Sequence, residues 1–367
     1  MPASCAVVLG GYGNFGRLIV AALAADGAHR VIVAGRDARQ ARAVADASGA
    51  PAEAAVLDTR ATNFAAELRR LGANVVVHTA GPFQGQDYGV PRACIEARAH
   101  YVDLADARAY VCGIQTLDDA ARSNDVLVVS GASSVPALSS AVVDRLQAQF
   151  SKIESIEHGI TSGAKPPGLA AMEGVLSYAG KPIAQWRDGA WRTAYGWQDF
   201  TRRVYPKPVG SRWLGNCDVP DLELFPLRYA PVKTVVFRAG VAQTMSMLAT
   251  WIASWLVRAG LMKSLVPQVP RLRDAALAIE RFGSKASGMH VTVGGLDGQS
   301  RPISRTWRLL ADNNHGPRVP CFPAIALARQ LLRGEVRARG ARPCMGLLTV
   351  DEILAVGSGL DLRTLEE

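Results

Sequence analysis

Over the first 130 residues, the pattern of apolar and polar positions predicts strands that alternate with helices. Short apolar runs, typical of strands buried on both faces, are separated by stretches in which apolar residues recur at helical spacing. The predicted strands are residues 5–10, 30–34, 54–57, 74–79, 100–104 and 125–130, and the predicted helices are 17–25, 38–48, 62–71, 90–97 and 114–123. This alternation favours an α/β fold with a doubly wound parallel sheet.

The pattern changes after Pro136 and predicts a second, mixed α/β domain. Helices are expected over 137–149 and 169–179, a strand over 155–162, and hairpins where Asp-Gly pairs interrupt alternating flanks, at 188–189 and 297–298. Helices over 322–332 and 349–356 are expected to return to the first domain. We therefore expect domains at 1–135 and 136–317, with a C-terminal segment, 318–367, that packs back on the first domain.

Composition excludes disordered and fibrous proteins, because 49% of the 367 residues are hydrophobic and 20% are charged. The net charge of +9 comes from arginines that are spread along the chain. This spread favours a solvated surface with affinity for phosphorylated cofactors over nucleic-acid binding. The six cysteines show no metal-ligand spacing and no signal-peptide pattern precedes them, so we expect a cytoplasmic protein without a metal site.

The strongest local signal is a glycine-rich segment between the first predicted strand and the first helix, Gly11-Tyr12-Gly13-Asn14-Phe15-Gly16. In this context Gly11 permits a tight turn, Gly13 lets a pyrophosphate approach the backbone, and Gly16 allows close packing of helix on strand. The helix start, with Asn14 and Phe15, offers N–H groups and a positive dipole end to the pyrophosphate. These residues predict the dinucleotide site of a Rossmann domain.

The second predicted strand ends in Ala34-Gly35-Arg36-Asp37, where NAD-specific sites place an acid for the ribose 2′-hydroxyl. Here Arg36 stands at the strand tip, and its guanidinium can pair with a 2′-phosphate. Asp37 lies one residue later, where it suits the cap of the next helix. Arg36 therefore predicts NADP rather than NAD. Asp58, after the third strand, either meets the adenine amine or caps a turn.

These residues resemble the saccharopine dehydrogenase-like NADP-binding oxidoreductases. The resemblance rests on GGYGNFG at 10–16, AGRD at 34–37 and the long block HTAGPFQGQDYGVPRACIEARAHYVDLAD at 78–106. It implies a Rossmann domain followed by an α/β substrate domain. It also implies that Ala80, Gly81 and Pro82 border the phosphates and the nicotinamide ribose, and that Asp103 and Asp106 lie near the nicotinamide. The second domain lacks an obvious amino-acid-binding pattern, so saccharopine itself is not expected as substrate.

Asp103, Asp106 and His315 are the candidate catalytic residues. The two aspartates either polarise a water or carbonyl or cap helices. His315, in the polar loop 312–317, either donates a proton or belongs to an ordinary Asn-rich turn. His78 lies inside an apolar strand, which favours a hydrogen-bonded core histidine. Substrate is expected to bind between residues 81–83, residues 103–106 and the second domain.

Nineteen uncharged residues, 239–257, separate two arginines. One polar stripe runs along this stretch, formed by Gln243, Ser246, Thr250 and Ser254. The stripe favours a buried or dimer-interface helix over association with a membrane surface or a helix that spans the membrane.

The function expected is hydride transfer between NADP and a C=O, C=N or C=C bond of a small molecule. The alternative is a non-catalytic dinucleotide-binding protein whose apolar helix contacts a membrane or a partner.

Overall fold

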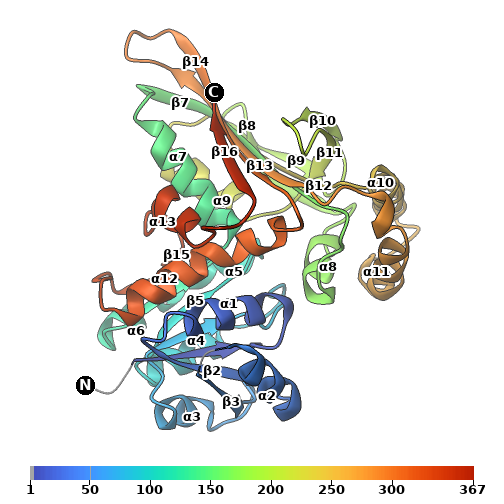
Figure 1. The fold of residues 1–367 in the computed structure, drawn as a ribbon. Helices are drawn as coiled ribbons and strands as arrows, with labels where there is room; N and C mark the ends of the chain where they lie inside the picture. Colours follow the sequence, from blue (N-terminus) through green and yellow to red (C-terminus); the bar gives the residue numbers. More distant parts are fainter. Residues whose placement is uncertain (1–3, 50) are drawn as a thin grey trace. The chain divides into compact units, whose positions relative to one another are not determined.

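The computed structural model describes residues 4–49 and 51–367, and the chain divides into two compact units, each with its own sheet (Figure 1). The first unit combines Met1–Leu138 with Pro320–Val356, and the second combines Ser139–Val319 with Gly357–Glu367. The predicted α/β fold is confirmed, and residues 320–356 of the C-terminal segment belong to the first unit.

The sheet of the first unit has seven strands among the described residues, in the order β15-β6-β5-β4-β1-β2-β3, and every neighbouring pair is parallel. The strands are β1 (Cys5–Leu9), β2 (Arg30–Gly35), β3 (Ala52–Val56), β4 (Val75–His78), β5 (His100–Asp103), β6 (Leu127–Ser130) and β15 (Gly340–Pro343). The chain leaves β1 toward β2 and β3 on one side and returns to β4 on the other. The order therefore reverses between β1 and β4, which is where open α/β sheets bind ligands.

Helices cover this sheet because its central strands, such as Val75–His78, are buried along their whole length. They are α1 (Asn14–Ala24), α2 (Ala38–Ala47), α3 (Phe64–Arg70), α4 (Gly89–Glu96), α5 (Arg108–Gly113), η1 (Ile114–Leu117), α6 (Asp118–Ser123), η2 (Ser134–Leu138), α12 (Phe322–Leu332) and α13 (Val350–Ala355). The returning helix α12 contacts α1, β4 and β5, and nine of its eleven residues are buried. This burial explains why the C-terminal segment belongs to the first unit.

The sheet of the second unit is mixed, with the main order β10-β11-β12-β7-β13-β14-β16 and β8 and β9 attached beside β12. Its strands are β7 (Lys152–Ser162), β8 (Pro182–Arg187), β9 (Ala190–Tyr195), β10 (Thr201–Val204), β11 (Ser211–Asn216), β12 (Thr234–Val241), β13 (Ser287–Leu296), β14 (Pro302–Ala311) and β16 (Leu362–Glu366). Both predicted hairpins form, β8–β9 and β13–β14. Asp188 and Gly189 both take positive φ, as an Asp-Gly hairpin turn requires.

The helices of the second unit are α7 (Ser139–Gln147), α8 (Leu169–Leu176), α9 (Asp221–Arg228), α10 (Thr244–Arg258), η3 (Val266–Gln268), α11 (Val269–Ala278), η4 (Glu280–Phe282) and η5 (Gly316–Cys321), the last of which crosses into the first unit. A buried polar cluster joins α7 and α9 to β7, because Asp221 accepts hydrogen bonds from Ser139 at 2.6 Å and binds His158 Nε2 at 2.7 Å. All three side chains are fully or almost fully buried.

Two expectations about the second unit need correction. Residues 239–241 end the strand β12 instead of opening the apolar helix, which begins at Thr244. The final strand, β16, pairs with β14 in the second sheet, so the segment 318–367 does not return to the first unit as a whole. The edge of β14 that β13 leaves open supplies the partner strand for β16.

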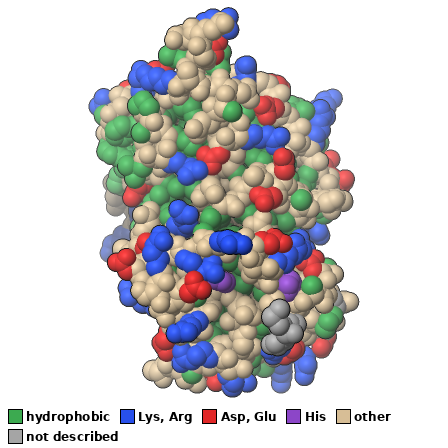
Figure 2. Space-filling model, turned by 90° about the vertical axis from the view of Figure 1, so that its left-hand side faces the viewer, with side chains coloured by type: hydrophobic (Ala, Val, Ile, Leu, Met, Phe, Trp, Pro, Cys, Tyr) green, Lys and Arg blue, Asp and Glu red, His purple; other side chains and the backbone are tan. Residues whose placement is uncertain are grey.

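No helix among the described residues is long and apolar enough to cross a membrane. On the face shown in Figure 2, lysine and arginine side chains are spread among acidic and apolar ones.

Candidate functional site

The glycine-rich loop lies at the carboxyl end of β1 and is held in place by tight backbone packing. Gly10 takes a φ of +74° and makes the turn. A side chain at Gly16 would collide with the backbone of Gly10, so the predicted close packing of helix on strand is observed. At Gly11 the absence of a side chain allows close packing on β2 instead of the expected turn, because a Cβ there would lie 2.8 Å from the side chain of Val33.

The beginning of α1 is open toward this loop. Gly13 is the N-cap residue, no side chain caps the helix, and its first turn carries no acidic residue. The backbone N–H groups of the first turn, at Asn14, Phe15 and Gly16, therefore face the loop together with the positive end of the helix dipole. This arrangement fits an anionic pyrophosphate.

Arg36 follows β2 at the same edge of the sheet. Its side chain is exposed and forms no hydrogen bond or ion pair with any residue that the structure describes. The neighbouring Asp37 is committed to the N-cap of α2, because its carboxylate accepts the backbone N–H groups of Arg39 at 2.9 Å and Gln40 at 3.1 Å. The side-chain amide of Gln40 adds a further hydrogen bond at 2.9 Å, and these bonds lower the pKa of Asp37.

Sequence reasoning missed Tyr12, which joins the glycine-rich loop to the end of β2. The ring of Tyr12 occupies the space that a side chain at Gly35 would need, and its hydroxyl accepts the N–H of Asp37 at 3.4 Å. An aromatic residue inside a glycine-rich loop, together with a glycine at the end of the next strand, is the signal that could have revealed this contact. Tyr12 thereby shapes the surface beside Arg36.

Asp58 lies just beyond β3 and accepts the backbone N–H of Arg60 at 3.0 Å. This bond matches the turn-capping alternative, although the exposed carboxylate keeps a second oxygen available.

After β4, Thr79 donates to the carbonyls of Leu9 at 2.9 Å and Gly10 at 3.1 Å, which ties this loop to the glycine-rich loop. Both loops therefore border the point where the strand order reverses.

The segment Ala80-Gly81-Pro82 continues the loop after β4. Gln86 fixes its shape, because the side-chain amide donates to the carbonyls of Ala80 at 3.0 Å and Pro82 at 2.7 Å. Ala80 is exposed, and Gly81 and Pro82 are partly exposed, at the carboxyl edge of the sheet. The segment thus offers accessible backbone next to the glycine-rich loop.

His78 is a core residue, as its position in an apolar strand predicts. It is 2% exposed, its Nδ1 lies 2.9 Å from the hydroxyl of Tyr101, and its ring packs edge-on against Phe83. Burial lowers the pKa of His78 to about 4. The imidazole is therefore uncharged at pH 7, and its packing against Phe83 helps to position the loop after β4.

Asp103, at the carboxyl end of β5, is completely buried. Its Oδ1 accepts hydrogen bonds from the backbone of Ala105 at 2.9 Å, the hydroxyl of Ser130 at 3.0 Å and the backbone of Gly131 at 2.8 Å. Burial raises the pKa of Asp103 to about 6 in spite of these bonds. The contacts join the ends of β5 and β6 and favour a positioning role over contact with substrate.

Asp106 is the more accessible of the two predicted aspartates. Its side chain is partly exposed and accepts the amide of Gln84, from the loop after β4, at 3.3 Å. Burial raises the pKa of this carboxyl group above its ordinary value. A carboxyl group with a raised pKa at the ligand-binding edge of a sheet is suited to donate or accept a proton.

His315 belongs to the second unit, whereas the other predicted site residues share the carboxyl edge of the first sheet. Its Nδ1 accepts the backbone N–H of Asp361 at 2.9 Å, and the Asp361 carboxylate lies 3.3 Å from the same atom. The side chain is 23% exposed. The accepted hydrogen bond places the proton of a neutral imidazole on Nε2.

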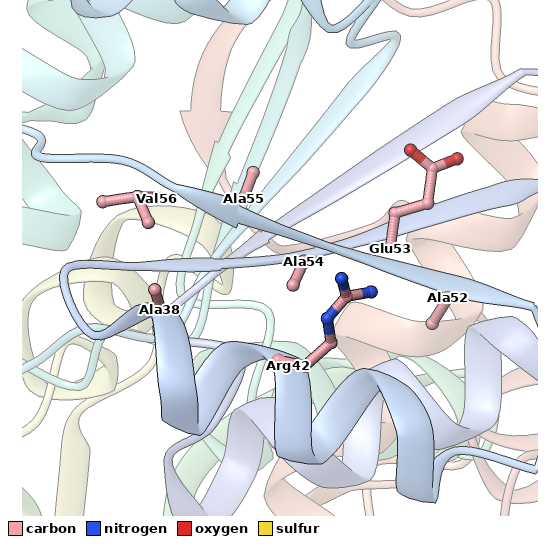
Figure 3. A pocket seen from close by; sticks show the side chains of 7 residues that line it. All are labelled: Ala38, Arg42, Ala52, Glu53, Ala54, Ala55 and Val56. Atoms are coloured by element: carbon pink, nitrogen blue, oxygen red, sulfur yellow. The ribbon is translucent and has the colours of Figure 1, made fainter.

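A cavity of about 390 Å³ lies along the edge strand β3 and the helix α2 (Figure 3). Its lining is mostly alanine, and Arg42 extends across it. Glu53 in its wall is paired with Arg30 at 2.6 Å. The cavity arises because the edge strand carries small side chains, and it contains none of the predicted site residues.

Comparison with known proteins supports the NADP-binding assignment. Residues 6–129 match the model of the saccharopine dehydrogenase NADP binding domain, which confirms the predicted resemblance for the first domain. Among curated proteins, no sequence matches the chain.

Two solved structures share the fold over almost the whole length. Saccharopine dehydrogenase (L-Glu forming) from Saccharomyces cerevisiae is 13% identical with a TM-score of 0.69, and the match covers 99% of this chain and 100% of that one. Homospermidine synthase from Legionella pneumophila in complex with NAD is 9% identical with a TM-score of 0.63, covering 100% of this chain and 91% of the other. At these identities the likeness establishes the fold.

Proposed function

We propose that this chain, whose first domain is the NADP-binding domain of the saccharopine dehydrogenase family, is an NADP-dependent oxidoreductase. Its substrate would be a small molecule with a C=O, C=N or C=C bond. The observation that carries this proposal is the shared edge of the first sheet, where the open start of α1, the unpaired Arg36 and the carboxyl group of Asp106 all follow the ends of parallel strands.

The residues present fit the cofactor in three places. The first turn of α1 and Gly13 would hold the pyrophosphate, and Arg36 would pair with the 2′-phosphate. The segment 80–82 would border the phosphates and the nicotinamide ribose. The nicotinamide supplies or accepts the hydride when the cofactor is bound.

The chain's own contribution to the reaction is to position the reactants and move a proton. Asp106 is the proposed catalytic acid or base, since its raised pKa keeps a proton available closer to neutral pH than for an ordinary carboxyl group. Gln84 would orient that carboxyl group through the hydrogen bond at 3.3 Å. Asp103 is a positioning residue in this proposal, and His315 remains a second candidate for proton transfer.

A turnover screen tests the proposal. NADPH oxidation is followed at 340 nm against pooled aldehydes, ketones, mixtures of 2-oxo acids with amines, and enoyl thioesters. Turnover with one pool that requires both the protein and that pool supports an oxidoreductase. Tight NADPH binding without turnover in any pool would favour the non-catalytic dinucleotide-binding alternative.

A further inference from the structure

The helix α10 turns its apolar side outward. Of its fifteen residues only Met247 and Ser254 are buried. The exposed side chains recur at spacings of three and four residues, as one face of a helix requires. They are Met245, Leu248, Ile252, Trp255 and Leu256, with exposed fractions between 38% and 72%.

The polar stripe of the same helix faces the interior of the second unit. Gln243 donates to the carbonyl of Ile279 at 2.9 Å, and the fully buried Ser254 accepts the amide of Gln198 at 3.3 Å. An ordinary surface helix has the reverse arrangement. Because these polar groups are satisfied by internal hydrogen bonds, the helix cannot rotate its apolar face inward without losing them.

Of the two expected settings, a buried helix and a dimer-interface helix, the exposed apolar side of α10 contradicts the first and leaves the second untested. Trp251 is partly buried and packs near Phe200, but Trp255 is 43% exposed, with the guanidinium of Arg258 over its ring at 4.8 Å. The inner face of α10 thus carries the hydrogen-bonded Gln243 and Ser254 together with the buried Met247, while most of the other large apolar side chains point outward.

The exposed apolar surface continues onto the neighbouring segment that contains α11. The hydrogen bond from Gln243 to Ile279 ties the start of α10 to the end of α11. Nine of the fifteen exposed large hydrophobic residues in the described chain lie between residues 245 and 279. We call residues 244–285 the α10–α11 surface. A concentration of this kind marks an interaction site.

The charge of the α10–α11 surface is strongly positive. The segment carries two acidic residues, Asp274 and Glu280. It carries six basic residues, which are Arg258, Lys263, Arg271, Arg273, Arg281 and Lys285. The exposed apolar stripe therefore lies within a segment that has four excess positive charges.

We propose that the α10–α11 surface binds the face of a lipid bilayer that contains anionic lipids. Exposed Trp, Leu and Ile side chains on a helix enter the boundary between headgroups and acyl chains, and nearby lysines and arginines attract anionic headgroups. A second copy of the same surface is a poorer partner, because an isologous contact would bring two positively charged segments together. Since no described helix can span a membrane, the binding is peripheral.

The test is flotation of the full-length protein with vesicles of phosphatidylcholine and phosphatidylglycerol, 1:1, and with phosphatidylcholine alone. The protein should float with the anionic vesicles, and this binding should weaken at least tenfold from 0.05 to 0.5 M salt. Ile252→Ser and Lys263→Glu should each reduce it about fivefold or more. The matched controls, Leu227→Ser and Arg192→Glu, change exposed residues outside the α10–α11 surface and should bind like the wild type.

Sedimentation velocity of the same proteins distinguishes binding to lipid from binding to a second copy of the chain. If the surface binds lipid, Ile252→Ser should leave the sedimentation coefficient unchanged in the absence of lipid. The proposal is overturned if the wild type does not float with anionic vesicles, or if Ile252→Ser converts a dimer into a monomer. Because the readouts are binding and mass, neither outcome depends on whether the chain oxidises NADPH.

Discussion

The carboxylate of Asp37 accepts two hydrogen bonds from Gln40, from the backbone N–H at 3.1 Å and from the side-chain amide at 2.9 Å. This pairing commits the acid next to Arg36 to the beginning of α2. Both oxygens of this carboxylate accept hydrogen bonds from the first turn of α2, which is the stabilising role of an N-cap residue. At the end of β2, Asp37 therefore caps the helix α2, whereas the adjacent Arg36 is the residue proposed to bind the 2′-phosphate.

Asp37→Ala should therefore lower stability without changing the choice of cofactor. Loss of the cap leaves the first N–H groups of α2 without their acceptor, so the urea midpoint of unfolding should fall. The ratio of NADP to NAD affinity, measured by titration calorimetry, should stay within about twofold of the wild type. A large loss of NAD affinity alone would show that Asp37 contacts the ribose.

Asp103→Asn should make the protein more stable at pH 8 than the wild type. The folded pKa of about 6 lies roughly 2 units above the unfolded value, so keeping this buried group ionised costs on the order of 3 kcal/mol. For a carboxyl group with a raised pKa, the stability is fully present below about pH 4 and is lost as the pH rises through 6. Asparagine keeps an Oδ1 that can accept the same three hydrogen bonds.

Urea unfolding between pH 4 and pH 8 measures this difference. The advantage of Asp103→Asn should be greatest at pH 8 and should shrink toward zero as the pH falls to 4. An advantage that does not vary with pH would mean that Asp103 titrates normally in the folded protein. A variant less stable at every pH would mean that the negative charge itself is needed by the three donors.

Asp106→Asn should reduce kcat by about 10²- to 10⁴-fold, the usual contribution of a general acid or base. NADPH affinity should be unchanged, because the residues proposed to hold the cofactor are Gly13, Arg36 and the segment 80–82. If Asp106 acts as an acid, wild-type kcat should decrease as the pH rises through its raised pKa, and the variant should lack that limb. Asp119→Asn, an exposed carboxylate on α6, is the matched control.

Most of the first domain could be predicted from the sequence because its signals are local. The apolar runs at β1, β2 and β4 are found within a residue or two of their predicted positions. In the second domain, the Asp-Gly turn at 188–189 likewise forms its predicted hairpin. The edge of the first sheet that is expected to bind the cofactor could be predicted from the same strands, because parallel strands place their carboxyl ends together. The roles assigned to Arg36 and Asp106 remain predictions.

The parts that could not be predicted depend on long-range contacts. The strands β15 and β16 are short, and each becomes a strand through its pairing with a sheet formed much earlier in the chain. The burial of Asp103 depends on Ser130 and Gly131, which the sequence separates from it by 27 and 28 positions. For α10, periodicity identified the polar stripe, but only the contacts of Gln243 and Ser254 show which side faces inward.

The measurement that tests the central claim most directly is titration of NADP and NAD into the wild type and Arg36→Ala. A charge-assisted bond to the 2′-phosphate contributes on the order of 1.5–3 kcal/mol, so the wild type should bind NADP roughly 10- to 100-fold more tightly than NAD. Arg36→Ala should lose most of this preference and keep its affinity for NAD. Arg39→Ala removes an exposed positive charge three residues along and should keep the preference. Equal affinities in the wild type, or tighter binding of NAD, would contradict the account.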